Sequence, residues 1–141
     1  MAISFTSESV KFSPKQKTKL KSWVETVVKK EKKTPHNINY VFSNDEFLLK
    51  LNKQFLKHDS YTDIITFDYN EGKKIAGDVF ISVDRVKENA KKFKVAAEQE
   101  LLRVMIHGVL HLCGYKDKSK SDKAEIRKKE DAALVLFKKI K

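Results

Sequence analysis

The sequence predicts an α+β domain in which a small mixed β-sheet packs against several helices. Three observations support this class. Short β-prone segments alternate along the chain with longer segments of helical periodicity. Turn and capping residues separate these segments. The length of 141 residues and the hydrophobic content of 40% are sufficient for one core, so we expect a single domain over residues 1–141.

The first expected element is a helix over residues 13–33. The first twelve residues lack a basic segment followed by an apolar one, so no signal peptide is expected, and we assign no element there. Ser13-Pro14 is typical of a helix start, because serine caps free backbone N–H groups and proline tolerates the first helical position. We expect Pro35 to end this helix. Its apolar stripe consists of Leu20, Trp23, Val24, Val27 and Val28.

A strand and a second helix follow. Residues 37–42 alternate as a half-buried strand does. Ser43 and Glu46 have the spacing of a capping box, which predicts a helix that continues to Phe55. Residues 61–69 and 75–82 are β-prone and flank a turn at residues 70–72, which predicts a hairpin.

The C-terminal half is predicted to be helical. We expect a short helix over residues 84–93 and a longer one over residues 96–113, which Gly114 ends in a left-handed conformation. A last helix is expected over residues 121–139. Its inward residues are predicted to be Ile126, Ala133, Leu134 and Phe137. The charged residues from Lys123 to Glu130 are interpreted as a solvated face of that helix.

The charge of the chain favours an anionic partner. Thirty basic against 19 acidic residues give a net charge of +11, which attracts nucleic acid or another anionic surface. A lysine-rich surface that only maintains solubility explains the charge equally well at this point. No apolar run reaches the roughly 18 residues of a membrane span, so no membrane partner is expected. Cys113 is the single cysteine, which fits a reducing cytoplasm.

His107, His111 and Asp117 form the candidate metal site. Residues four apart lie above one another on a helix, so both imidazoles project from one face and can meet one zinc ion. Gly114 ends the helix, and the following turn lets Asp117 return as a third ligand. Three protein ligands leave a fourth position open, as in catalytic zinc sites. The sequence therefore predicts one zinc ion per chain, in a metzincin-like HxxxH…D arrangement on a helix and the turn after it.

Two other interpretations of this pattern are a histidine pair without a metal and a metallopeptidase. A histidine pair at helical spacing also occurs without a metal, but here it falls on an apolar helix, and the mid-helix Gly108 indicates a close backbone approach. Zinc peptidases place a glutamate general base directly after the first histidine. Because that position is Gly108, a metallopeptidase is the less favoured interpretation.

The segment from His107 to Tyr115, followed by Asp117, resembles the signature of the YbeY family. Leu51-Asn52, residues 62–67 (Thr-Asp-Ile-Ile-Thr-Phe) and residues 77–82 (Gly-Asp-Val-Phe-Ile-Ser) agree with it in the same order. The resemblance implies a cytoplasmic, metal-dependent endoribonuclease specific for single-stranded RNA. It further implies a role in 16S rRNA 3′-end maturation and ribosome quality control, with ribosomal RNA and the small ribosomal subunit as partners.

Two positions depart from the family pattern. Asp117 stands where most members have a third histidine, and Leu56 stands where they have an arginine thought to contact phosphate. Lys57 and His58 lie beside Leu56 in a polar loop and become the candidate catalytic residues. Because leucine cannot bind phosphate, Leu56 favours an alternative function, that of a non-catalytic RNA-binding assembly factor with a structural zinc.

Overall fold

The computed structural model describes residues 3–58 and 60–140. The helices and strands in this part of the chain are, in order, β1 (Ile3–Ser7), α1 (Lys17–Lys30), β2 (Thr34–Ser43), α2 (Asp45–Leu51), the π-helix η1 (Asn52–Leu56), β3 (Ile64–Asp68), β4 (Lys74–Ser82), α3 (Val83–Phe93), α4 (Ala97–Leu112) and α5 (Lys120–Lys139).

The four strands form one mixed sheet in the order β1-β2-β4-β3. β1 and β4 both run parallel to β2, with Ile3 opposite Ile38 and Val79 opposite Tyr40. β3 pairs antiparallel with β4, with Ile64 opposite Ile81, which confirms the predicted hairpin. The mixed α+β class is therefore confirmed.

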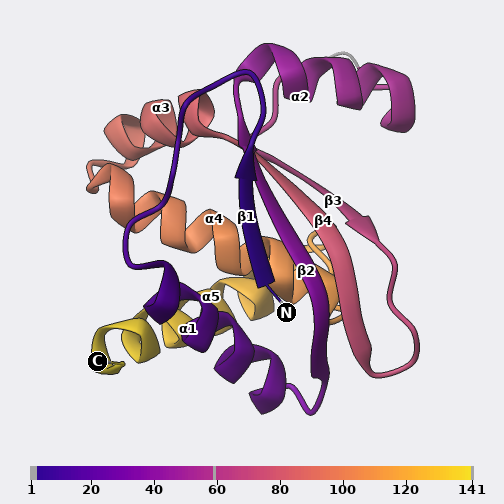
Figure 1. Ribbon diagram of the computed structural model, residues 1–141, viewed down its shortest axis with the longest axis vertical. Helices are drawn as coiled ribbons and strands as arrows, with labels where there is room; N and C mark the ends of the chain where they lie inside the picture. Colours follow the sequence, from indigo (N-terminus) through magenta and orange to yellow (C-terminus); the bar gives the residue numbers. More distant parts are fainter. Residues whose placement is uncertain (1–2, 59, 141) are drawn as a thin grey trace.

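Helices α1, α4 and α5 gather on one side of the sheet, and α2 lies at the end of the sheet that is uppermost in the view (Figure 1). The core lies between this side of the sheet and the helices, and Trp23, Tyr40 and Met105 are among its fully buried members. The polar groups of Trp23 and Tyr40 both form hydrogen bonds in this core. Trp23 Nε1 donates to the Ala133 carbonyl at 2.7 Å, and the Tyr40 hydroxyl donates to the Met105 carbonyl at 3.0 Å. These bonds tie α1 to α5 and β2 to α4.

The N-terminal region differs from the prediction in two respects. Residues 3–7, to which no element was assigned, form edge strand β1, whose Ile3 is buried. α1 begins at Lys17 rather than at Ser13, after Gln16 in a left-handed conformation (φ 58°). The prediction that Pro14 takes the first helical position was wrong, because Pro14 is buried in the segment that precedes the helix.

The boundaries around β2 also shift. α1 ends at Lys30, and Pro35 lies inside β2, where the register shifts between Pro35 and Asn37. A proline cannot donate to the ladder, so this irregularity lets the strand include it. The cap of α2 is Asn44, whose side chain accepts from the Phe47 N–H at 2.9 Å, and not Ser43. The Ser43 hydroxyl instead donates to the Glu8 carbonyl at 2.6 Å.

Helix α4 lies close to the sheet at Gly108. A Cβ atom at this position would lie 2.8 Å from Ile64 Cδ1 of β3 and 2.8 Å from Val79 Cγ1 of β4. The close approach predicted for this glycine is confirmed. At the end of α4, Gly114 adopts the positive φ (111°) that favours glycine, and the Tyr115 N–H donates to the Leu110 carbonyl at 3.0 Å, as the predicted cap requires.

Replacing Gly108 by valine should destabilise the fold. The added atoms would collide with Val79, which is fully buried and cannot move away, so the free energy of unfolding should fall by about 1–3 kcal/mol. Urea denaturation followed by circular dichroism measures this change. Gln99→Val, on the exposed face of the same helix, controls for the helix propensity of valine and should cost only a few tenths of a kcal/mol. Equal losses in the two variants would contradict the packing argument.

Candidate metal centre and adjoining cavity

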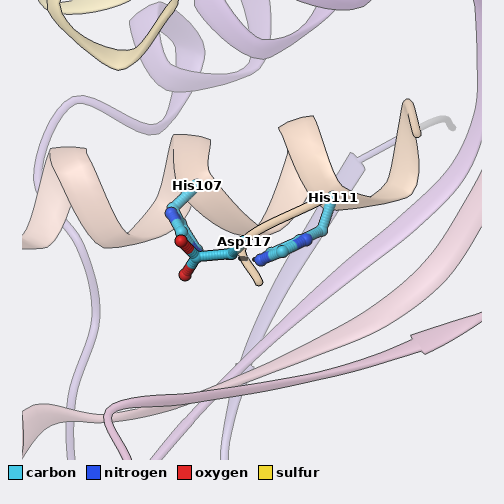
Figure 2. Close-up of side chains that lie close together, drawn as sticks. All are labelled: His107, His111 and Asp117. Carbon is cyan, nitrogen blue, oxygen red and sulfur yellow. Dashed lines mark hydrogen bonds and ion pairs between the residues drawn. The ribbon is translucent and has the colours of Figure 1, made fainter. Parts of the chain in front are cut away.

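His107 and His111 project from the same side of α4, and Asp117 reaches them from the loop that follows the helix (Figure 2). The two histidine Nε2 atoms are 2.9 Å apart. Asp117 Oδ2 lies 3.6 Å from His107 Nε2. All three residues offer ligand atoms within 4.8 Å of one another, so they could hold a metal ion.

The two Nε2 atoms suit a metal because the Nδ1 atom of each ring is held by a different partner. His107 Nδ1 donates to Glu130 Oε2 at 2.5 Å, and His111 Nδ1 donates to the Tyr115 carbonyl at 2.8 Å. With Nδ1 as the donor in both rings, each Nε2 keeps a lone pair that can bind a metal ion placed between the two histidines. Hydrogen bonds of this kind orient metal-binding histidines in proteins generally.

The spacing of the ligand atoms also fits a tetrahedral ion. Ligands at ~2.0–2.1 Å from a tetrahedral zinc lie about 3.3 Å from one another. The observed separations of 2.9 Å and 3.6 Å lie on either side of this value. Two neutral imidazoles and one carboxylate form a donor set that zinc accepts, with a fourth position open.

Glu130 of α5 is part of this centre, although its sequence context indicated a solvated face. That interpretation was wrong for Glu130, which is only 4% exposed, whereas Lys123, Glu125 and Lys129 are exposed as predicted. One carboxylate oxygen accepts from His107, and the other accepts from Arg103 Nη1 at 2.8 Å. Arg103 also binds Asp131 at 2.8 Å. Arg103 of α4 therefore binds two carboxylates of α5, and one of these, Glu130, also holds the imidazole of His107.

The ionisation of the two histidines differs. Burial lowers the pKa of His107, but the hydrogen bond and charge of Glu130 outweigh burial, so the pKa is raised. Burial and the neighbouring His107 lower the pKa of His111. Burial raises the pKa of Glu130, yet its bonds with His107 and Arg103 outweigh that effect and place its pKa below the ordinary value. Glu130 is therefore held as an anion that attracts positive charge at His107.

A cavity of about 590 Å³ adjoins the centre. Its walls come from the start of β3, the end of α3, α4, the loop after α4 and α5, and His107 and Asp117 lie on it. Two further acidic residues on its wall, Asp63 and Glu100, were not identified from the sequence. For Glu100 a signal existed, since it lies seven residues before His107 and therefore on the same helical face. For Glu130 the signal was its place among the apolar positions 126, 133 and 137.

Lys57 and His58 lie in a different setting. Both are exposed in the loop after η1, and neither is among the described residues that line the cavity. Asn52 fixes this loop, since its buried side chain donates to the Ser60 carbonyl at 2.8 Å and its carbonyl accepts from the His58 N–H at 3.1 Å. A catalytic role for Lys57 and His58 stays a prediction.

Comparison with known proteins identifies the family. The family model described as Endoribonuclease YbeY matches residues 2–138. A protein named Endoribonuclease YbeY from Flavobacterium psychrophilum is 52% identical over 135 residues, which cover 96% of each chain. Another of the same name from Cytophaga hutchinsonii is 50% identical over 137 residues, again covering 96% of each. The chain belongs to the YbeY family.

The family resemblance predicted from the sequence is thus confirmed, and the fold agrees with it. The solution structure of TM1509 from Thermotoga maritima superposes with a TM-score of 0.68 at 30% identity, over 96% of this chain and 88% of that one. The YbeY relatives are named for RNA cleavage, which places this chain among enzymes that hydrolyse RNA. In the described ranges 3–58 and 60–140, no helix combines the length and the apolar character needed to cross a bilayer.

Glu130→Gln should weaken metal binding. The amide keeps an acceptor for His107 but loses the charge that raises the basicity of the imidazole, and such outer partners are worth about 10- to 100-fold in metal affinity. Competition against a chromophoric chelator measures the change. Asp131→Asn is the matched control, because Asp131 also binds Arg103 but has no contact with His107. Equal affinity in the wild type and Glu130→Gln would contradict this account.

Proposed function

We propose that this chain is a zinc-dependent endoribonuclease that cleaves single-stranded RNA. Its substrate would be the precursor of 16S ribosomal RNA at the 3′ end, and its partner the small ribosomal subunit in the cytoplasm. A role in ribosome quality control belongs to the same proposal, as does the organisation of residues 1–141 as one domain. The observation that carries the proposal is the convergence of His107, His111 and Asp117 in a chain that matches the YbeY family from residue 2 to residue 138.

His107, His111 and Asp117 would hold the zinc ion. Bound there, zinc would supply a Lewis acid that polarises a phosphoryl oxygen or lowers the pKa of water. The chain itself contributes orientation, since Glu130 and the Tyr115 carbonyl hold the two imidazoles with Nε2 turned toward the ion. The net charge of +11 supports RNA as the substrate, because basic residues raise the local concentration of phosphate.

A non-catalytic assembly factor with a structural zinc is the second candidate function. The observation that favours it is Leu56, which is 46% exposed at the position where the family has an arginine. A metallopeptidase has less support. Gly108 occupies the position of the peptidase general base, and its packing against Ile64 and Val79 leaves no room for a glutamate.

Metal content and cleavage separate these candidates. The purified protein should contain about one zinc per chain, and it should cleave a pre-ribosomal RNA transcript but not casein. His111→Ala should lose most of the metal and His107→Ala the RNA cleavage, since each removes a ligand. His36→Ala, which changes an exposed histidine of β2, is the matched control and should behave as the wild type.

The three outcomes of this experiment have different meanings. Zinc binding without RNA cleavage supports the assembly factor, and casein cleavage supports the peptidase. Full metal retention in His111→Ala contradicts the ligand assignment.

Lys57 is the candidate for the missing phosphate contact. If its ammonium group replaces the family arginine, Lys57→Ala should reduce cleavage by about tenfold or more, or about 1.4 kcal/mol of transition-state stabilisation. Zinc content should not change. Lys50→Ala, an exposed lysine of α2, is the control. If instead the arginine is simply lost, Leu56→Arg should raise cleavage at unchanged zinc content. A robust rate that neither substitution alters would contradict a role for this loop.

A further inference from the structure

The cavity beside the candidate metal centre contains carboxylates that the proposed chemistry does not use. Its volume is about 590 Å³, enough for more than one ring system, and it opens onto His107 and Asp117. A group held in it would therefore lie next to the point at which RNA would be cleaved. Asp63, directly before β3, and Glu100 of α4 lie on its wall.

Glu100 is largely enclosed and faces the cavity, with no hydrogen-bond partner among the described residues. It is 6% exposed, and its carboxylate has neither a hydrogen bond nor an ion pair with any described residue. Burial, reinforced by the charge of Asp63, raises the pKa of Glu100. Burial also raises the pKa of Asp63, whose side chain binds no other described side chain. The Glu100 oxygens are not cut off from solvent but face the cavity, and they have no protein donor, so a ligand that supplies N–H groups there would meet a carboxylate with unused acceptor capacity.

A second metal ion fits these residues less well than an organic ligand. Within residues 3–58 and 60–140, the group of three ligands at metal-binding distance is His107, His111 and Asp117, and neither Asp63 nor Glu100 belongs to such a group. Single-stranded RNA, in contrast, offers bases whose edges carry N–H donors. Guanine presents two adjacent ones, N1–H and the N2 amine, which match the two oxygens of one carboxylate. Adenine and cytosine offer one amine each, and uracil offers one imino N–H.

The rim of the cavity suits the rest of a nucleotide. Phe93 at the end of α3 is 56% exposed and offers a ring face for base stacking. Lys123 and Arg127 are exposed and one turn apart on α5, and both lie on the cavity wall. Their charges can hold a backbone phosphate at the mouth while the carboxylates lie deeper.

We propose that this cavity binds one unstacked base of the RNA substrate and that Glu100 selects guanine by accepting from its N1–H and N2 amine. The inference rests on RNA being the ligand of this site, as proposed above. Asp63 contributes a second acceptor, and Phe93 stacks on the base or its neighbour. Recognition here determines which phosphate of a flexible strand comes to rest beside His107.

Binding of cleavage-resistant RNA tests the inference. Fluorescent 2′-O-methyl hexanucleotides of uridine with a single central guanosine, inosine or uridine are titrated with the protein and followed by anisotropy. Inosine differs from guanosine only by the missing N2 amine. Guanosine should bind about 5- to 100-fold more tightly than uridine, and inosine should lie between them, since a bidentate base contact gives discrimination of this order. Equal binding of the three RNAs would overturn the proposal.

Two variants assign the preference to its residue. In Glu100→Gln one acceptor becomes a donor, so the ratio of guanosine to uridine affinity should fall toward one. Glu98→Gln, an exposed glutamate of the same helix, should keep the wild-type ratio. Circular dichroism checks that both variants fold, and if Glu100→Gln does not, the comparison of the three RNAs on wild-type protein decides. An unchanged ratio in folded Glu100→Gln overturns the assignment.

The remaining outcomes separate this inference from the proposed function. A second metal equivalent that Glu100→Gln removes, together with equal binding of the three RNAs, would make the cavity a metal site and overturn the inference. Guanine preference without RNA cleavage would support the base site and contradict the nuclease. RNA cleavage without guanine preference would support the nuclease and contradict the base site.

Discussion

The close approach of α4 to the sheet is the constraint on which the site depends. Gly108 allows the helix backbone to lie against Ile64 and Val79, and this contact fixes the height of α4 above β3 and β4. His107 precedes the contact residue by one position and His111 follows it by three, so the contact anchors the segment that carries both imidazoles. The same glycine occupies the position at which a peptidase would carry its general base. Packing and chemistry are therefore coupled at one residue.

A second contact joins α4 to α5 through a polar seam, formed by Glu130 of α5 with His107 and Arg103 of α4. Most helix pairs in small domains meet through apolar side chains, but here Glu130 is buried between His107 and Arg103. A buried carboxylate is stabilised only when both of its oxygens are bound, and in this structure they are. Because His107 is one of the two partners, the seam holds the imidazole in place for a metal as well as holding the helices together. The stability of α5 packing and the order of the centre thus depend on the same bonds.

The sequence predicted the parts of the fold that repeat a period and missed those that depend on distant partners. The helix that carries His107 and His111, its end at Gly114 and the β3–β4 hairpin were predicted correctly, because periodicity and turn residues are local signals. β1 was missed, since five residues at a sheet edge give little pattern until β2 lies beside them. Glu130 was misinterpreted for a related reason. Its surroundings in sequence are lysines, and only the packing of α5 on α4 buries it.

The distribution of charge around the cavity reconciles an acidic interior with a basic protein. A net charge of +11 attracts the RNA backbone at long range, and this attraction is the same for every sequence of bases. In the proposed complex, Asp63 and Glu100 would repel phosphate at short range, and Lys123 and Arg127 would hold the backbone at the rim. The part of the nucleotide suited to the interior would then be the base, which carries no negative charge and offers N–H groups. Long-range attraction and short-range repulsion would together orient a single strand with a base turned inward and its phosphate near the candidate metal ligands.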